Sequence, residues 1–139
     1  MGVEPAVGSL RWAVLITDLD PTRGHEQGGS RRALVVSYEP FHRSASMTVC
    51  PITAARSVTR YPNEVAIPAG EAGQTKAGVI LCHQVRTVSL LRVPRPLSTL
   101  GYLMNPDLRE QVRLALARHL GLDIPAGGDG ATGRQAFKA

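Results

Sequence analysis

Short runs of apolar residues, separated by turn-forming residues, fill the first two thirds of this chain. Their lengths and their content of Val, Ile and Leu are typical of β-strands. The strands are expected at residues 12–17, 33–37, 47–52, 64–67 and 79–88. Gly, Pro, Asn and Asp mark the turns between them. The last run is long enough to bend or to pair with two neighbours.

One helix is expected near the C-terminal end. Asn105 is a favourable N-cap, Pro106 suits the first helical position, and Gly121 is a typical helix terminator. Apolar residues between them recur at helical spacing and form one stripe. The stripe contains Leu108, Val112, Ala115, Leu116 and Leu120. This face should pack against the strands.

Many short strands followed by one helix indicate an α+β fold. We expect a small, strongly twisted antiparallel β-sheet or half-barrel with the C-terminal helix packed on it. At 139 residues the chain has the length of a single domain, which we assign to residues 11–122. Segments 1–10 and 123–139 contain Gly and Pro without apolar periodicity, so both are expected to be flexible.

The net charge of +5 comes almost entirely from arginine, since only Lys76 and Lys138 are lysines. Guanidinium groups bind phosphates through paired hydrogen bonds and stack on bases. The same composition also arises from a GC-rich genome and a solvated basic surface. Charge alone therefore leaves nucleic-acid binding and an ordinary basic surface equally open.

The two cysteines stand inside separate apolar runs, at Cys50 and Cys82, without a metal-binding spacing. We expect buried thiols in a reducing compartment, no metal and no cofactor. The N-terminal residues lack the basic and apolar stretches of a signal peptide, and no apolar run approaches the length of a membrane span. These features favour a cytoplasmic protein that does not enter a membrane.

Two segments carry the strongest functional signal. One is the turn-rich loop Asp18–Arg31, which leads into the strand expected at 33–37, and the other is Cys50-Pro51-Ile52-Thr53, which closes the next apolar run. Together with residues 84–88 they resemble the MazF/PemK family of bacterial toxin endoribonucleases, over about residues 12–122. The resemblance implies a β-barrel-like homodimer that cuts single-stranded RNA without metal, leaving a 2′,3′-cyclic phosphate and a 5′-hydroxyl. It also implies a MazE-type antitoxin that blocks the substrate groove, and no DNA substrate is expected.

Such cleavage needs a base for the 2′-hydroxyl, a proton donor for the leaving 5′-oxygen and fixed positive charge beside the phosphorus. Arg31 is the candidate for the charge, because guanidinium keeps its proton and the preceding Gly28-Gly29 pair leaves room for a bulky chain. Thr53, at a strand end, can hydrogen-bond a phosphate oxygen, although a threonine there commonly only satisfies a turn. The resemblance places Arg31 and Thr53 at the positions most closely tied to catalysis.

Glu26 and His25 compete for the role of general base. A histidine with a pKa near about 6.5 is better poised for proton transfer than a glutamate near about 4.3, whereas the resemblance favours the acidic position. Glu26 would equally serve in an ion pair with Arg31 or Arg23 that shapes the loop. The other histidines have weaker claims, because His42 is expected in a polar turn, His83 inside a strand and His119 at a helix end. The catalytic candidates are Arg31, Thr53 and Glu26, with the base undecided.

A basic element at Gln84-Val85-Arg86 is expected to contact the substrate. In a strand, Gln84 and Arg86 share one face, so an amide that reads a base edge and a cation that holds a phosphate point the same way. A solvated outer face is the alternative. Arg56 and Arg60 stand beside Tyr61 and would line a channel in which a base stacks on the ring. The substrate-binding candidates are His25, Gln27, Arg32, Gln84, Arg86 and Arg60.

The chain departs from the family pattern in two places. Trp12-Ala13 stands where members usually have a Gly-acid pair, and Arg32 follows Arg31 where members usually have proline. Because successive strand residues point to opposite faces, Arg31 and Arg32 are not expected to enter the same site. Arg32 would then reach a phosphate outside the site or meet an acidic partner.

Two other functions fit the same fold. A CcdB-like gyrase poison goes with a tryptophan in the terminal segment after the last helix, whereas the only tryptophan here is Trp12. The second alternative is a non-catalytic relative that binds RNA or antitoxin, and the presence of both Arg31 and Thr53 argues against it. The sequence does not define the cleavage motif, the cellular RNA targets or the cognate antitoxin.

Overall fold

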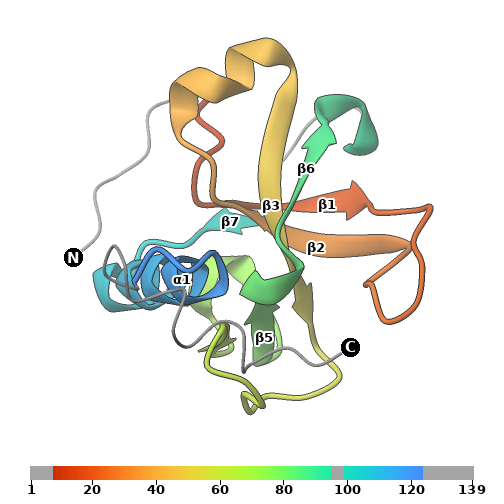
Figure 1. Cartoon of the computed structure of the whole chain (residues 1–139). Coiled ribbons are helices and arrows are strands. Elements are labelled where there is room, and N and C mark those ends of the chain that lie inside the picture. The colour runs from red at the N-terminus through yellow and green to blue at the C-terminus, as the bar shows by residue number, and fades with distance from the viewer. Residues whose placement is uncertain (1–7, 95–98, 124–139) are drawn as a thin grey trace.

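The computed structural model describes residues 8–94 and 99–123, and this part of the chain folds into a curled β-sheet with one α-helix beside it (Figure 1). The strands are β1 (Ala13–Asp18), β2 (Ser30–Val35), β3 (Ser46–Thr53), β4 (Glu64–Ile67), β5 (Gly78–Leu81), β6 (Arg86–Ser89) and β7 (Gly101–Tyr102). The helix is α1 (Pro106–His119). Four short 3₁₀ turns, η1 (Glu39–Ser44), η2 (Glu71–Gly73), η3 (Cys82–Gln84) and η4 (Leu90–Arg92), connect strands.

All strand pairings are antiparallel, in the order β4-β5-β3-β2-β1-β7, with β6 also paired to β3. β3 is the central strand, because successive parts of it pair with β6, β2 and β5. Figure 1 shows this long strand beside β6, with β1 and β2 crossing it. The expected antiparallel half-barrel with a C-terminal helix is confirmed.

Both faces of the sheet are buried, because side chains alternate along its strands. The core between one face and α1 contains Val14, Leu34, Ile52 and Ile80 of the sheet and Leu108, Val112 and Ala115 of the helix. The core on the other face contains Leu10, Leu15, Leu19, Val35, Met47, Val49 and Val88. The sheet is therefore a rigid support for the loops at its edges.

The helix begins as expected, with the Asn105 side chain accepting hydrogen bonds from the backbone N–H groups of Asp107 (2.8 Å) and Leu108 (3.2 Å). It ends at His119, just before Gly121, whose φ is +71°. The expected apolar stripe is wrong at its last position. Leu120 is 60 % exposed, because it lies beyond the helix end and no longer faces the core.

The apolar run at 79–88 does serve two pairings. It forms β5, which pairs with β3 and β4, then the turn η3, then β6, which returns to β3. β2 starts three residues earlier than expected, because Ser30, Arg31 and Arg32 still pair with β1. The short β7 had no apolar pattern to predict it.

Trp12, one of the two departures from the family pattern, has a φ of +71°, which glycine adopts most easily. Its ring is 6 % exposed, and the guanidinium carbons of Arg11, Arg109 and Arg113 lie 5.1, 5.2 and 5.3 Å from the ring centre. Burial and these cation–π contacts offset the strained backbone. The expected flexible segments fall largely outside the described residues, and within 8–10 Leu10 is buried in the core.

Candidate functional site

An opening lies where β2 and β3 diverge. Their pairing ends at Ala33 and Pro51; beyond it β2 stays beside β1, while β3 pairs with β5. Continuing the β2–β3 register by two residues brings Arg31 opposite Thr53. The cavity at this divergence measures about 270 Å³ and is lined by Ile16, Ser30, Arg31, Arg32, Ile52, Thr53, Ala54 and Ala55. The two principal catalytic candidates therefore share one cavity.

Arg31 is exposed, and its Nε donates to the backbone oxygen of Gly28 (2.9 Å). This bond holds the side chain near the beginning of β2. Among the described residues, no carboxylate lies within ion-pair distance of its guanidinium, and its two terminal nitrogens form no hydrogen bond. The charge is therefore free to bind an anion in the cavity.

Thr53 is 7 % exposed, and its hydroxyl oxygen accepts a hydrogen bond from the backbone N–H of Ala55 (3.1 Å). It thus satisfies a turn, as expected of an ordinary threonine at a strand end. The bond uses the hydroxyl as an acceptor, so its proton remains available for donation. A fixed donor beside the Arg31 charge can bind a phosphate oxygen.

The β1–β2 loop is closed tightly around its glycines. A Cβ on Gly28 would lie 2.6 Å from Thr22 Oγ1 and 2.7 Å from Asp20 Oδ1, and Gly29 has a φ of +72°. The backbone N–H of Gly29 donates to Asp20 Oδ1 (2.9 Å). The glycines therefore allow the loop to fold on itself. The expectation that they leave room for an incoming chain is wrong at Gly28, because loop side chains fill that space.

Three side chains from η3, β6 and η4 hold this loop in place. Arg86 Nη1 donates to the backbone oxygen of Leu19 (2.9 Å), and Arg92 Nη1 donates to that of Asp18 (3.2 Å). Gln84 accepts from the backbone N–H of Gln27 (2.8 Å) and donates to the backbone oxygen of His25 (3.4 Å). The loop position is thus coupled to the β5–β6 connection.

The prediction that Gln84 and Arg86 share one face of a strand is wrong. Gln84 ends the turn η3, and the strand resumes only at Arg86, because the chain leaves β5 and reverses its pairing here. The Gln84 amide is occupied by the loop backbone. Both side chains nevertheless line one cavity of about 330 Å³, together with Glu26, Gln27, Pro51, His83 and Val85.

Glu26 lies on the exposed surface of the loop. Its Oε1 accepts a hydrogen bond from the backbone N–H of Arg23 (2.6 Å). No ion pair joins it to Arg23 or Arg31 within the described residues. Glu26 therefore shapes the loop through its hydrogen bond with the backbone of Arg23. It lines the 330 Å³ cavity and not the one that contains Arg31.

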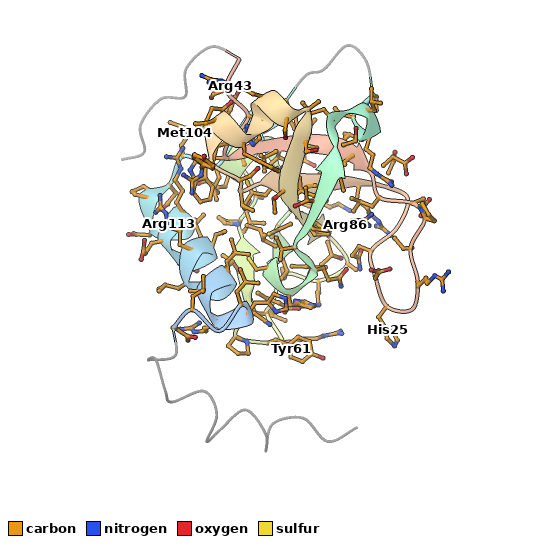
Figure 2. All side chains as sticks on the ribbon, turned by 45° about the horizontal axis from the view of Figure 1, so that its top comes forward. His25, Arg43, Tyr61, Arg86, Met104 and Arg113 are labelled. Carbon is orange, nitrogen blue, oxygen red and sulfur yellow. The ribbon has the colours of Figure 1, made fainter. Side chains whose placement is uncertain are left out.

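A third and larger cavity of about 590 Å³ begins at Thr53. It is lined by His25, Gln27, Thr53, Ala55, Arg56, Arg60, Tyr61, Glu64, Leu81, His83 and Gln84. It shares Thr53 and Ala55 with the first cavity, and Gln27, His83 and Gln84 with the second. Figure 2 shows His25 at the far end of the loop, Arg86 near the base of the loop and Tyr61 on the neighbouring edge. The three cavities are adjacent parts of one polar groove, on the side of the molecule away from Arg113.

A buried ion pair forms one wall of this groove. Arg56 donates to both oxygens of Glu64 (2.9 and 2.6 Å), and the backbone N–H of Arg60 donates to Oε1 (2.8 Å). Burial by itself raises the pKa of Glu64, but the hydrogen bonds and charge of Arg56, with the N–H of Arg60, outweigh it and lower the pKa to about 2. Arg56 is thus occupied, while Arg60 and Tyr61 remain exposed beside the cavity, as expected for a channel.

His83, which had only a weak claim from the sequence, lines two cavities of the groove. It lies in η3, where its ring packs edge-on against Tyr61 with 5.8 Å between ring centres. Its Nδ1 lies 3.8 Å from Glu64 Oε2. No sequence pattern links positions 64 and 83, because the pairing of β4 with β5 brings them together.

Arg32 lines the same cavity as Arg31, contrary to expectation. Alternation does place the two on opposite faces, but the diverging strands leave the gap open to both. Arg32 Nη1 donates to Gln74 Oε1 (2.8 Å), and Gln74 is buried. The partner of Arg32 is therefore a neutral amide and not the acidic group suggested by the sequence.

Within residues 8–94 and 99–123, no group of three His, Cys, Asp or Glu side chains is placed to hold a metal ion. Cys50 and Cys82 are buried free thiols there, and a hydrogen bond with Cys82, together with burial, raises the pKa of Cys50. In the same residues, no helix is both long and apolar enough to cross a membrane.

Comparison with known proteins agrees with this geometry. The sequence profile of the family "PemK-like, MazF-like toxin of type II toxin-antitoxin system" matches residues 10–120. Endoribonuclease EndoA of Bacillus subtilis is 33 % identical over 108 residues, which cover 77 % of this chain and 93 % of the relative.

Two solved structures have the same fold. MazF from Deinococcus radiodurans aligns with a TM-score of 0.64 and 31 % identity, covering 80 % of this chain and 94 % of that one. A mycobacterial endoribonuclease in complex with its cognate antitoxin aligns with a TM-score of 0.65 and 25 % identity, covering 84 % and 98 %. The chain therefore belongs to the PemK-like, MazF-like family of type II toxin-antitoxin toxins.

Proposed function

We propose that this chain is the toxin of a type II toxin-antitoxin pair and an endoribonuclease that cuts single-stranded RNA at a short recognition sequence without metal. The observation that carries the proposal is the shared cavity, in which the unpaired guanidinium of Arg31 and the fixed hydroxyl of Thr53 are available to one anion. The endoribonuclease names of the relatives support it. The MazF relatives make a gyrase poison the weaker alternative, and the only tryptophan, Trp12, is buried.

The chemistry follows from the groups in the groove. The 2′-oxygen attacks the phosphorus, the bond from phosphorus to the 5′-oxygen breaks, and a 2′,3′-cyclic phosphate and a 5′-hydroxyl remain. Arg31 and Thr53 donate hydrogen bonds to the non-bridging oxygens, which gain negative charge in the transition state. DNA is not expected to be cut, because it lacks the 2′-hydroxyl nucleophile.

The neighbouring cavities are suited to the nucleotides on either side of the scissile phosphate. Tyr61 offers an exposed ring for base stacking, and Arg60 and Arg86 offer charge for the backbone. His25, Gln27 and Gln84 connect these regions. The choice of bases next to the cut should depend on the β1–β2 loop, which carries His25 and Gln27, since the shape of this loop sets which base edges fit.

A homodimer and a MazE-type antitoxin are the expected partners in the cytoplasm. Among the similar structures are a mycobacterial endoribonuclease in complex with its cognate antitoxin and MazE-MazF from Deinococcus radiodurans. A partner that carries carboxylates would compete with RNA for the free guanidinium of Arg31. Binding of the antitoxin should therefore inhibit cleavage by occupying the groove.

The test is cleavage of a defined single-stranded RNA by purified protein in chelator, with the cut ends mapped. Arg31→Ala is expected to reduce the rate by about 100-fold or more, because removal of one transition-state donor typically costs this much. Arg43→Ala is the matched control, since Arg43 is exposed on η1 outside the groove. Cleavage that requires added magnesium, or full activity of Arg31→Ala, would refute the proposal.

A further inference from the structure

His83 lies at the junction of two cavities of the groove. It lines the 590 Å³ cavity together with Thr53 and the 330 Å³ cavity together with Glu26 and Arg86. It is carried by η3, a short turn held between β5 and β6, so its backbone position is fixed by two strand pairings. A titratable group at this point can reach a substrate that passes through either cavity.

The ring of His83 packs edge-on against Tyr61 and turns Nδ1 towards Glu64. Nδ1 is enclosed, has no hydrogen-bond partner in the described structure, and faces Glu64 Oε2 at 3.8 Å. Glu64 remains ionised near neutral pH, because its pKa is lowered to about 2. A carboxylate facing Nδ1 favours the tautomer that carries its proton there, which leaves the lone pair on Nε2. The side chain is 25 % exposed, so its outer edge opens to the groove.

The other two candidates for the base are held less firmly. His25 is exposed on the loop, and within the described residues its ring has neither an aromatic nor a carboxylate contact, whereas His83 has both. Glu26 is exposed, and one of its carboxylate oxygens is occupied by the backbone N–H of Arg23. A general base must meet its proton at hydrogen-bond distance, so an imidazole carried by a turn between two paired strands has the advantage over groups on an exposed loop.

We propose that His83, oriented by Glu64, is the general base of RNA cleavage; this inference rests on the proposed endoribonuclease function. Nε2 takes the proton of the 2′-hydroxyl as the bond from the 2′-oxygen to phosphorus forms. The bond from phosphorus to the 5′-oxygen breaks, and that oxygen takes a proton from water. The imidazolium then returns its proton to solvent. Glu64 acts as a positioning residue.

Glu64 of β4 and Tyr61 of the preceding loop contact the His83 ring. Arg118 and His119 belong to α1, which also packs against η3. The groups that line its two cavities are His25, Glu26, Arg56, Arg60 and Arg86. Glu64, Tyr61 and the groups that line the two cavities must be unchanged in any variant used to read a pH profile.

The experiment compares His83→Gln with wild type on a single-stranded RNA in chelator, over a range of pH. The variant is expected to lose about 100-fold or more in kcat/KM and to lose the rise of rate with pH on the acidic side, because the base is gone. Its affinity for the 2′-deoxy analogue of the cleavage site should be unchanged. His119→Gln is the matched control, since His119 is exposed at the end of α1.

A second substrate distinguishes a general base from a general acid as the role of His83. Replacing the bridging 5′-oxygen by sulfur gives a leaving group that needs no proton, so His83→Gln should remain slow on it. Recovery of the rate on this substrate would overturn the assignment as base. An unchanged rate or an unchanged pH profile of His83→Gln, with active wild type, would also overturn it. Inactive wild type would instead refute the proposed function itself.

Discussion

The buried pair of Arg56 and Glu64 leads to a quantitative prediction. The Glu64 side chain has no exposed surface and accepts three hydrogen bonds, two from Arg56 and one from the Arg60 N–H. Glu64→Gln keeps the shape but removes the charge, leaving the Arg56 guanidinium without its counter-ion. This change should destabilise the wall of the groove.

The magnitude follows from the pKa of Glu64, which is lowered from 4.5 to about 2. At roughly 1.36 kcal/mol per pH unit, the ionised group contributes about 3 kcal/mol to the free energy of unfolding at pH 7. Because the folded-state pKa is the lower one, this stability is complete above the unfolded value and is lost as the pH falls towards 2. The difference between wild type and Glu64→Gln should thus shrink to about 1.4 kcal/mol at pH 3.

Urea denaturation at fixed protein concentration would measure this difference at both pH values. The fluorescence of Trp12 is a suitable probe, because it is the only tryptophan and is buried. Glu110→Gln is the matched control: Glu110 pairs with Arg113 at 3.4 Å, but both side chains are at least half exposed, so its loss should cost less than about 1 kcal/mol. A cost at Glu64 below about 1 kcal/mol at pH 7, or an equal cost at pH 3, would contradict the reasoning.

Three further substitutions test the groove. Thr53→Val should slow cleavage while Thr53→Ser largely preserves it in a single-turnover assay, because only serine keeps the donor; equal rates would remove Thr53 from the site. Gly78→Ala places a Cβ 2.5 Å from the backbone oxygen of Thr53. We expect the free energy of unfolding, measured by urea denaturation, to fall by about 1–3 kcal/mol and RNA cleavage to slow. Wild-type stability and activity would contradict the packing described. Arg32→Ala leaves Oε1 of the buried Gln74 without its partner and should lower the free energy of unfolding by about 1–3 kcal/mol. It should also weaken RNA binding by an amount that shrinks at high salt; a large loss of kcat would instead make Arg32 catalytic.

The fold could be predicted largely because its signals are local. The apolar runs and the Asn105, Pro106 and Gly121 signals for the helix each act within a few residues of sequence. Errors arose where tertiary pairing decides the outcome. β2 is lengthened at Arg31 by its pairing with β1, and β7 exists only because β1 offers an edge.

The residue types of the site could be predicted from the sequence, but which side chains contact one another could not. Arg31 and Thr53 do share a cavity, yet that cavity exists because two strands diverge, which no local pattern indicates. Gln84 looked like a base reader, but its amide holds the loop backbone. His83 looked like a strand residue until the pairing of β4 with β5 placed Glu64 beside it.

A structure of the protein bound to an RNA whose cleavage site carries a 2′-deoxy nucleotide tests the central claim most directly. The uncut phosphate should accept hydrogen bonds from the Arg31 guanidinium and the Thr53 hydroxyl, at about 2.7–3.2 Å, in the opening between β2 and β3. A phosphate bound elsewhere, with Arg31 still held only by Gly28, would contradict the account.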